Sequence, residues 1–414
     1  MRRRVVVTGA GVLTPVGNDV TKMWEAVCQG KSGVGPITKF DPTYHDTKIA
    51  GEIKNFDPLA HVNKKELRRL DDFIIYTLAA ADMLMAETGF VASGELAERT
   101  GVIIGSAIGG VASIEEEKET LMNHGPGKIS PFAIPAILGN LAAGQVSIRY
   151  NLKGPIECPA MACAAGAYGI GRAFHAIAYG YADAMVAGGV DAAVTPLSVA
   201  AFNAMRALSR RNEEPEKASR PFDQGRDGFV IAEGCGLVLL EELNQALNRG
   251  AKIYAEIVGF ASTSDAYHMA APPPGHEGAA RCMREALADA GVGPDEVDYI
   301  NAHGTSTPLN DLYELQAIKS VFGDHAPRLA ISSTKSVMGH LLGGAGGVEA
   351  VITVKAICED FVPPTINLDS PDPEVGDLDL VRNRGVKRDV RVAMSNSFGF
   401  GGANAVLVFK KYQD

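Results

Sequence analysis

The stretch "CAAGAYGIGRAFHAIAYGYADAMVAGG", residues 163–189, decides how this chain folds. It opens with a cysteine and continues as a helix-length run rich in alanine and glycine. Because small residues let a helix approach its neighbours closely, we predict that this helix lies buried at the centre of the molecule. A second stretch, "LGGAGGVEAVITVKAICEDFVPPT" (342–365), has the same character and predicts a second central helix.

An order of elements repeats around these two stretches. Each half of the chain runs as a strand, a second strand with a loop of small residues, and then the small-residue helix. The segments are 5–16, 101–110 and 163–189 in the first half, and 254–266, 298–308 and 342–365 in the second. β-Branched strands that alternate with helices favour α/β layers. We place the boundary near residue 250 and expect two related halves, 1–250 and 251–414, in one compact body.

Composition narrows the class of protein. Of 414 residues, 46% are hydrophobic and 21% charged, as in a globular enzyme with a substantial core. The net charge of −10 disfavours nucleic acid as the main partner. No apolar run reaches the length of a membrane span, so no membrane association is expected. The six cysteines show no metal-binding spacing, which favours a reduced, cytoplasmic protein.

The N-terminal segment superficially resembles a signal peptide and a dinucleotide-binding motif, but its residues argue against both. In "VTGAGVLTPVG" (7–17), Thr8 and the glycines interrupt the apolar run that a signal peptide needs. Thr14 stands where a dinucleotide fingerprint requires its third glycine, and Pro15 would interrupt the following helix. We therefore expect a first strand ending in a glycine turn. A nicotinamide-dependent oxidoreductase remains the alternative of a different class, to be tested by cofactor titration.

Cys163 is the candidate nucleophile. It stands where the alanine- and glycine-rich helix begins, and a helix N-terminus stabilises a thiolate and lowers the pKa of a thiol. Cys158 precedes Pro159 on the incoming segment and lacks this field. The competing interpretation is that Cys163 is only a small buried side chain.

The second half supplies possible partners for Cys163. His303 lies just after an apolar strand, and His340 lies just before the second small-residue helix. Both follow a strand and precede a glycine- or threonine-rich turn, so we expect both at element ends on one side of a sheet. Lys335 and Glu349 flank His340. The loop "SNSFGFGGAN" (395–404) surrounds aromatic residues with glycines, as in a segment that moves or makes close approaches.

Several motifs together carry a family resemblance. In this order and spacing they resemble the elongating β-ketoacyl-acyl carrier protein synthases, and among these the synthase II group. The motifs are "MACAAG" (161–166), "DGFVIAEGCGLVLLEE" (227–242), "STSDAYHMAAPPP" (262–274), "NAHGTSTPLND" (301–311), "SSTKSVMGHLLGGAGGVEA" (332–350) and "SNSFGFGGANA" (395–405). The resemblance covers nearly the whole chain. It implies the duplicated thiolase-like αβαβα layered sandwich and a homodimer.

The resemblance also implies a reaction and its groups. Cys163 would accept an acyl chain from a carrier thioester, and malonyl-carrier protein would lose CO₂ and attack it in a decarboxylative Claisen condensation. His303 and His340 would donate to the developing enolate oxygen, a role worth ~10²–10³ in rate per donor. The N–H groups of Cys163 and Phe400 would hold the tetrahedral oxyanion. Lys335, beside Glu349, would orient His340; its alternative role is a structural ion pair.

Further residues match substrate positions of that family. Thr305 and Thr307 would hold the pantetheine arm, or merely stabilise their turn. Ile108 and Phe202 would line the acyl tunnel, with Phe400 as its gate. A structural cation is possible near Asn301, Glu349, Ser395 and Asn396; no cofactor and no catalytic metal are expected.

The implied partner is an acidic acyl carrier protein. Lys65, Arg68 and Arg69 have the spacing of one helical face, and Lys128 and Arg206 match further family contacts. In a chain of net charge −10, we expect these residues to dock the carrier rather than only to be solvated.

The chain departs from the family pattern at four positions, Met161, Ala270, Ala271 and Asn310, which leaves chain-length range and carrier preference open. A discrete polyketide-type ketosynthase of the same chemistry stays the alternative. A degradative thiolase would need a second cysteine in the loop 395–404, and an initiating synthase would need asparagine at position 340.

Overall fold

Ten strands of the computed structural model, which describes residues 2–413, form one mixed sheet in the order β10-β9-β13-β14-β8-β1-β7-β6-β4-β5. The first half of the chain contributes β1 (Val5–Leu13), β4 (Thr100–Gly105), β5 (Ile156–Glu157), β6 (Ala184–Asp191) and β7 (Gly234–Glu242). The second half contributes β8 (Ala255–Ser264), β9 (Tyr299–Asn301), β10 (Ala330–Ser332), β13 (Val392–Gly399) and β14 (Ala403–Lys410). Two small sheets pair β2 (Gly35–Pro36) with β3 (Ile49–Ala50) and β11 (Phe361–Val362) with β12 (Val386–Lys387).

The strand order confirms the duplication. In each half the strands lie side by side in the order third, second, fourth, fifth, first along the chain. The pairing also agrees, with two parallel neighbours followed by two antiparallel ones. The halves join through antiparallel pairing of β1 with β8. The division of the chain at residue 250 stays our prediction.

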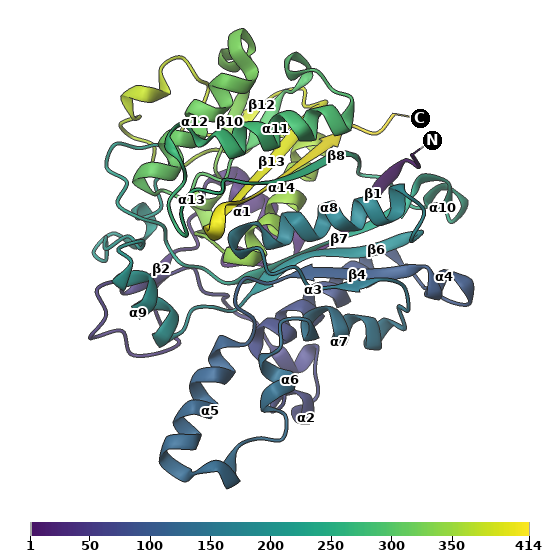
Figure 1. Ribbon diagram of the computed structural model, residues 1–414, viewed down its shortest axis with the longest axis vertical. Coiled ribbons are helices and arrows are strands. Elements are labelled where there is room, and N and C mark those ends of the chain that lie inside the picture. The colour runs from purple at the N-terminus through teal and green to yellow at the C-terminus, as the bar shows by residue number, and fades with distance from the viewer. Residues whose placement is uncertain (1, 414) are drawn as a thin grey trace.

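The predicted small-residue helices are confirmed as the central layer. α8 (Ala165–Ala178) and α14 (Ala345–Glu359) lie against each other between the two halves of the sheet (Figure 1). Glycine is needed at this contact, because a Cβ on Gly166 would lie 2.6 Å from the carbonyl oxygen of Gly343. The two small-residue helices thus approach backbone to backbone.

Outer helices complete five layers. α3 (Asp72–Thr88) and α7 (Leu141–Tyr150) cover the first half, whereas α11 (Glu277–Ala290) and α12 (Pro308–Phe322) cover the second. The layers therefore follow the predicted αβαβα sequence. The other helices are α1 (Val20–Gln29), α2 (Lys64–Leu67), α4 (Glu95–Glu98), α5 (Val111–His124), α6 (Ala133–Ile137), α9 (Pro196–Ala204), α10 (Leu243–Asn248) and α13 (Lys335–Met338). Of these, α2, α5 and α6 project from one end of the molecule (Figure 1).

The first strand differs from its expected course. β1 continues through Gly9 and Gly11 to Leu13, so these glycines form no turn. A Cβ on Gly11 would lie 1.9 Å from the carbonyl oxygen of Ala80 in α3, which explains the glycine by close packing of helix on strand. Between residues 2 and 413 no helix has both the length and the apolar character needed to cross a membrane.

Candidate active site

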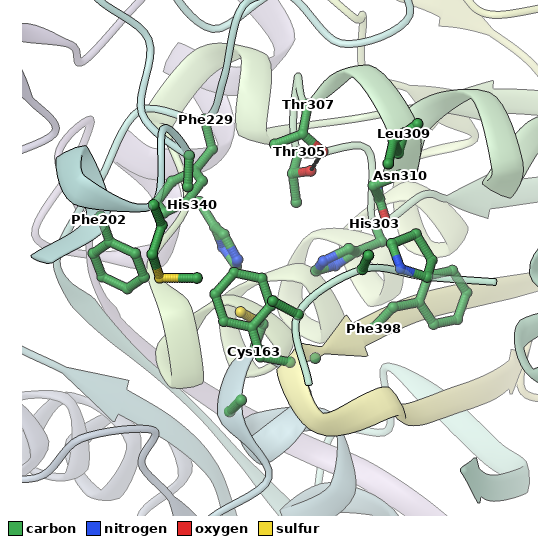
Figure 2. A pocket seen from close by; sticks show the side chains of 18 of the residues that line it. Cys163, Phe202, Phe229, His303, Thr305, Thr307, Leu309, Asn310, His340 and Phe398 are labelled. Carbon is green, nitrogen blue, oxygen red and sulfur yellow. Dashed lines mark hydrogen bonds between the residues drawn. The ribbon is translucent and has the colours of Figure 1, made fainter. Parts of the chain in front are cut away.

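One cavity of about 570 Å³ gathers most of the predicted site. It opens where the two halves of the chain meet beside the N-terminal ends of the central helices. The predicted residues that line it are Ile108, Cys163, Phe202, Arg206, His303, Thr305, Thr307, His340 and Phe400. Figure 2 shows the two imidazole rings directed toward the space beside Cys163. Chain segments about 140 residues apart thus build one site, which places Cys163 and the two histidines together as the sequence predicts.

Cys163 lies on a tight turn that leads into α8. The short 3₁₀ turn Ala162–Ala164 holds it, and Ala162 has a positive φ of 47°. The second half repeats this turn, with Leu342 at φ 50° ahead of α14. Gly399 approaches the turn closely, since a Cβ there would lie 2.7 Å from the carbonyl oxygen of Met161. The turn and the glycine-rich loop are therefore fitted to each other.

The pKa of the Cys163 thiol differs from expectation. Burial raises the pKa of Cys163 to about 12, whereas the helix N-terminus had led us to predict a lowered value. The charge of Lys335 and the N–H groups of Phe400 and Cys163 act in the opposite direction. Desolvation outweighs these favourable groups, so the resting side chain is a thiol. The two N–H groups nevertheless face the sulfur, where an oxyanion hole is needed.

His303 and His340 face each other across the cavity. Their ring centroids are 5.4 Å apart and their planes make an angle of 86°. Burial, with the charge of Lys335, holds the pKa of both rings well below the usual histidine range. Nδ1 of His303 and both ring nitrogens of His340 are buried without a hydrogen-bond partner among the described residues. Both rings are therefore neutral and have nitrogens available to a substrate.

The backbone positions of the two histidines have different origins. His303 comes two residues after β9, as predicted. His340 also follows a strand, β10, but α13 lies between the two. His340 is held instead by its backbone, whose N–H donates to the carbonyl of Val230 (2.8 Å) and whose carbonyl accepts from Ala232 (2.9 Å).

The group that holds the backbone at His303 was not predicted from the sequence. The carboxylate of Glu314 in α12 accepts the N–H groups of His303 and Gly304, each at 2.8 Å, and the side-chain amide of Asn396 at 3.2 Å. Burial raises the pKa of Glu314, while these donors lower it. A usable signal existed, since Glu314 lies three residues after Asp311, one helical turn beyond the quoted motif.

Lys335 and Glu349 form a buried ion pair behind the cavity. They do not line it, although the positive charge of Lys335 lowers the pKa of both histidines and of Cys163. Burial raises the pKa of Glu349 to about 7, and the contact with Lys335 opposes that rise. The pair therefore acts on the site through its electric field rather than by touching substrate.

The oxygens at the possible cation position suit such an ion. Asn301 and Ser395 are register partners on β9 and β13, and the side-chain amide of Asn301 donates to the carbonyl of Glu349 at 3.4 Å. Oε2 of Glu349, Oγ of Ser395 and Oδ1 of Asn396 are buried and have no hydrogen-bond partner in the part of the chain that the structure describes. Hard cations prefer such oxygen ligands, so these residues would hold one structurally. Within residues 2–413, no group of three histidine, cysteine or acidic side chains could bind a metal.

The predicted pantetheine residues lie on one pinned loop. The hydroxyls of Thr305 and Thr307 are 2.9 Å apart at the cavity wall. Between them, Ser306 donates its N–H to both carboxylate oxygens of Asp311, each at 3.1 Å. The guanidinium of Arg226 donates to the carbonyls of Thr307 (3.2 Å) and Pro308 (2.9 Å). Asp311 and Arg226 were not predicted as site residues.

The loop that carries Phe400 is tethered to a second loop across the cavity mouth. Gly401 and Gly402 have φ values of 81° and 74°. The N–H of Gly401 donates to the carbonyl of Met269, and the N–H of Asp265 donates to the carbonyl of Gly402. The side chain of Phe400 is 37% exposed, so it stands at the mouth rather than in the core.

The residues that depart from the family pattern sit near these loops. Ala270, Ala271 and Asn310 line the cavity, and the side-chain amide of Asn310 donates to Asp311 at 3.1 Å. Met161 packs against the central core instead.

The predicted basic residues separate into two places. Arg206 lines the cavity, but Lys65, Arg68, Arg69 and Lys128 are exposed and do not. The helix expected to carry three of them is one turn long and ends at Leu67, so Arg68 and Arg69 lie in the turn beyond it. The guanidinium of Arg69 lies 4.1 Å above the ring of Phe132, which joins this turn to the segment that follows Lys128.

Comparisons with known proteins agree with this arrangement. The family model described as "Beta-ketoacyl synthase, N-terminal domain" matches residues 2–246, and the one described as "Beta-ketoacyl synthase, C-terminal domain" matches residues 254–369. The chain is 51% identical to 3-oxoacyl-[acyl-carrier-protein] synthase 2 of Synechocystis sp., covering 100% of this chain and 99% of the relative. It is 52% identical to the protein of the same name from Coxiella burnetii, over 100% of both chains.

A solved structure matches as well. It is a complex of a type II polyketide synthase acyl-carrier protein with its ketosynthase bound to the hexaketide. The matching chain superposes with a TM-score of 0.92 at 36% identity, over 100% of each chain.

Proposed function

The chain belongs to the β-ketoacyl synthase family, and from that membership we propose that Cys163 is the acyl-accepting nucleophile and that His303 and His340 stabilise the enolate. The protein is a β-ketoacyl-[acyl-carrier-protein] synthase, an acyltransferase of fatty acid chain elongation, and its partner is an acyl carrier protein. The polyketide alternative has less support, because the polyketide ketosynthase complex is 36% identical and the fatty acid synthases are 51–52% identical.

One observation carries the assignment. A half-buried cysteine thiol shares a cavity with two neutral imidazoles whose buried nitrogens lack hydrogen-bond partners among the described residues. Buried polar groups are normally satisfied, so unpaired nitrogens beside a nucleophile suit a ligand oxygen. A merely structural cysteine would explain neither these nitrogens nor the Phe400 N–H directed at the sulfur.

The first half-reaction moves the acyl chain. The sulfur of Cys163 attacks the carrier thioester carbonyl, and the N–H groups of Cys163 and Phe400 stabilise the oxyanion that forms. The C–S bond to pantetheine then breaks, and the proton lost by Cys163 goes to the departing pantetheine sulfur. Since one thiol replaces another, the exchange needs no net acid or base, which is compatible with a thiol whose pKa is about 12.

The second half-reaction makes the carbon–carbon bond. The malonyl thioester loses CO₂, and the electron pair of that bond moves into an enolate whose oxygen becomes negative. Neutral His303 and His340, whose ring planes are nearly perpendicular, each present an N–H to this oxygen. The enolate carbon attacks the acyl-Cys163 carbonyl, and collapse of the tetrahedral adduct breaks the C–S bond to Cys163. This step releases the β-ketoacyl product and the Cys163 thiolate, which takes up one proton from solvent to restore the resting thiol. Thr305 and Thr307 hold the pantetheine arm, while Ile108 and Phe202 receive the acyl chain.

We also propose a homodimer. α5 has 14 residues but buries only Val111, and its contacts among the described residues are mainly with α6 and the turn Pro126–Lys128, which leave most of the helix uncovered. Ile134 on α6 is 65% exposed and Ile148 on α7 is 72% exposed, and the nearby β5 is an edge strand. A second copy would cover these apolar side chains and pair the edge. Sedimentation of the wild type and of Ile148→Lys tests this, because a monomeric wild type would refute it.

The location follows from thiol chemistry. All six cysteines are free, as expected of a protein kept in a reducing compartment, so we propose the cytoplasm. Fractionation of cells that express the protein, with an immunoblot of each fraction, tests the location. Recovery outside the cytoplasm would overturn it.

The acyl-enzyme itself provides the decisive experiment. Incubated with an acyl-carrier substrate, the wild type should gain the acyl mass and Cys163→Ala should not. Cys158→Ala is the matched control, since Cys158 does not line the cavity and should leave acylation intact. An acylated Cys163→Ala protein would refute the assignment of the nucleophile.

A further inference from the structure

Asp191 has a buried carboxyl group that no step of the proposed mechanism uses. It is the last residue of β6, has 0% exposure, and pairs with no cationic side chain among the described residues. Four hydrogen bonds satisfy it instead, from Ser106 Oγ (2.7 Å), Ala107 N (3.0 Å), Ile108 N (3.3 Å) and Gly343 N (2.6 Å). A buried carboxylate with this many donors fixes the segments that supply them.

The donors belong to two segments with different tasks. The loop Ser106–Ile108 leaves β4 and places Ile108 in the cavity wall. Gly343 lies three residues after His340, at the start of the second central helix. Oδ1 of Asp191 accepts from Ser106 and Ile108, whereas Oδ2 accepts from Ala107 and Gly343. One carboxylate therefore joins the acyl pocket to the turn that follows a proposed catalytic histidine.

The loop Ser106–Ile108 and the turn at Gly343 are tightly packed against each other. A Cβ on Gly343 would lie 2.6 Å from Ala107 N and 2.7 Å from Asp191 Oδ2, so the loop and the turn are in direct contact. The other end of the turn is held as well, by the backbone hydrogen bonds of His340 to Val230 and Ala232. A displacement of Ile108 must stretch a hydrogen bond to Asp191 or move the turn beside His340.

Electrostatics favour the ionised carboxylate at neutral pH. Burial raises the pKa of Asp191 to about 6, and the four donors restrain that rise. The negative charge is also felt at the nucleophile, where it raises the pKa of Cys163. That charge acts equally for acyl chains of every length, whereas the tether to Ile108 acts only on chains that reach the pocket wall.

We propose that Asp191 is a positioning residue that ties the acyl pocket at Ile108 to the turn after His340, and thereby sets how sharply the enzyme discriminates between acyl chain lengths. This inference rests on the proposed acyl transfer to Cys163. A chain too long for the pocket presses on Ile108, and the tether resists the movement that would admit it. Without the tether, the pocket yields and discrimination weakens.

The substitution Asp191→Asn tests the tether without leaving a cavity. An amide has one acceptor oxygen, and its NH₂ must oppose a backbone N–H in either orientation, that of Ile108 or those of Ala107 and Gly343. Ser106→Ala weakens only the side of the tether that faces Ile108. The matched control is Asp298→Asn, because Asp298 also accepts two backbone N–H groups, from Arg391 (2.8 Å) and Val392 (3.0 Å), but does not line the cavity.

The measurement is acylation of Cys163 by intact mass over a ladder of acyl-carrier chain lengths, with malonyl decarboxylation measured separately. Ile108→Phe is the positive control for the series of chain lengths, since the added phenyl ring should reduce the length of the longest acyl chain accepted. The ratio between the best and the worst accepted chain should fall about tenfold in Asp191→Asn, the effect of losing one hydrogen bond to a charged group. Ser106→Ala should reduce this ratio and leave decarboxylation unchanged, and Asp298→Asn should alter neither.

The possible failures are distinguishable. If Asp191→Asn slows every chain length and decarboxylation by one common factor, or leaves the ratio unchanged, the positioning role is overturned. If the wild type itself gains no acyl mass at Cys163, the proposed acyl transfer fails instead.

Discussion

The imidazole rings of His303 and His340 stand nearly perpendicular, at 86°, with their centroids 5.4 Å apart. Neither ring belongs to a hydrogen-bonded relay through its buried nitrogens, and burial keeps both uncharged. Two neutral donors that approach from different directions can share one oxygen. This geometry suits an enolate oxygen, which gains charge only as CO₂ leaves.

Loss of either histidine should slow decarboxylation. His303→Ala and His340→Ala should each lower the rate of CO₂ release from malonyl-carrier protein by at least about tenfold, the lower end of the effect of removing an oxyanion donor. His325→Ala is a suitable control, because His325 is half-buried, bonds the carbonyl of Val297 and does not line the cavity. Release of CO₂ at the wild-type rate by both variants would show that the roles are wrong.

The lowered pKa values of the two histidines predict that the rate of decarboxylation changes little on the acid side of its pH profile. For a histidine with an ordinary pKa of about 6.5, the neutral fraction would fall roughly fourfold between pH 8 and pH 6. Because the pKa of His303 and of His340 lies well below that range, both remain neutral as pH falls from 8 to 6. Decarboxylation by Cys163→Ala, which removes the thiol from the titration, should therefore change little over this interval. A decrease in rate that follows an ordinary histidine titration would contradict the lowered pKa values of the two rings.

The exposed basic residues should affect docking without affecting chemistry. Lys65 and Arg68 do not line the cavity, so replacing both with Glu should raise KM for carrier-bound substrate and leave small thioester substrates nearly unaffected. The difference should shrink as salt is raised, because exposed charges are screened. Lys48→Glu with Lys387→Glu is the charge-matched control at two other exposed lysines. Equal damage to both substrate types would indicate misfolding and not a docking defect.

Phe400 should gate acyl transfer through its ring. Phe400→Ala keeps the backbone N–H that faces Cys163 but removes the side chain at the cavity mouth, beside glycines with positive φ. Acylation of Cys163 should therefore suffer more than malonyl decarboxylation when the two are assayed apart. Normal acylation by Phe400→Ala at every chain length would remove the gate from the mechanism.

Local pattern was enough to predict much of the fold. The small-residue stretches 163–189 and 342–365 were identified as central helices because only glycine and alanine permit such close packing, and Gly166 meets Gly343 there. The repeat of elements predicted the duplication that the strand order displays. The order of the motifs also identified Cys163, His303 and His340 as candidates, because a nucleophile and its hydrogen-bond donors require particular residue types. All three line the cavity.

Tertiary structure decided what depends on distant neighbours. The helix N-terminus at Cys163 predicted a lowered pKa, yet burial by both halves of the chain raises it to about 12, because desolvation is a property of the whole surroundings. Arg68 and Arg69 have helical spacing, but the helix ends at Leu67 and spacing alone cannot set a boundary.

The contacts of the supporting carboxylates also depend on folding, although the position of Glu314 one helical turn beyond Asp311 was a usable signal for that residue. Glu314 is eleven residues from the N–H of His303 that it accepts, and Asp191 is 152 residues from that of Gly343. The sequence by itself determined the two central helices, the repeat and the residue types of the site, because these follow from local composition and spacing. Only the tertiary structure decided the pKa of the site residues and the hydrogen bonds that hold its loops. Electric fields and hydrogen bonds act through space and do not follow the order of residues along the chain.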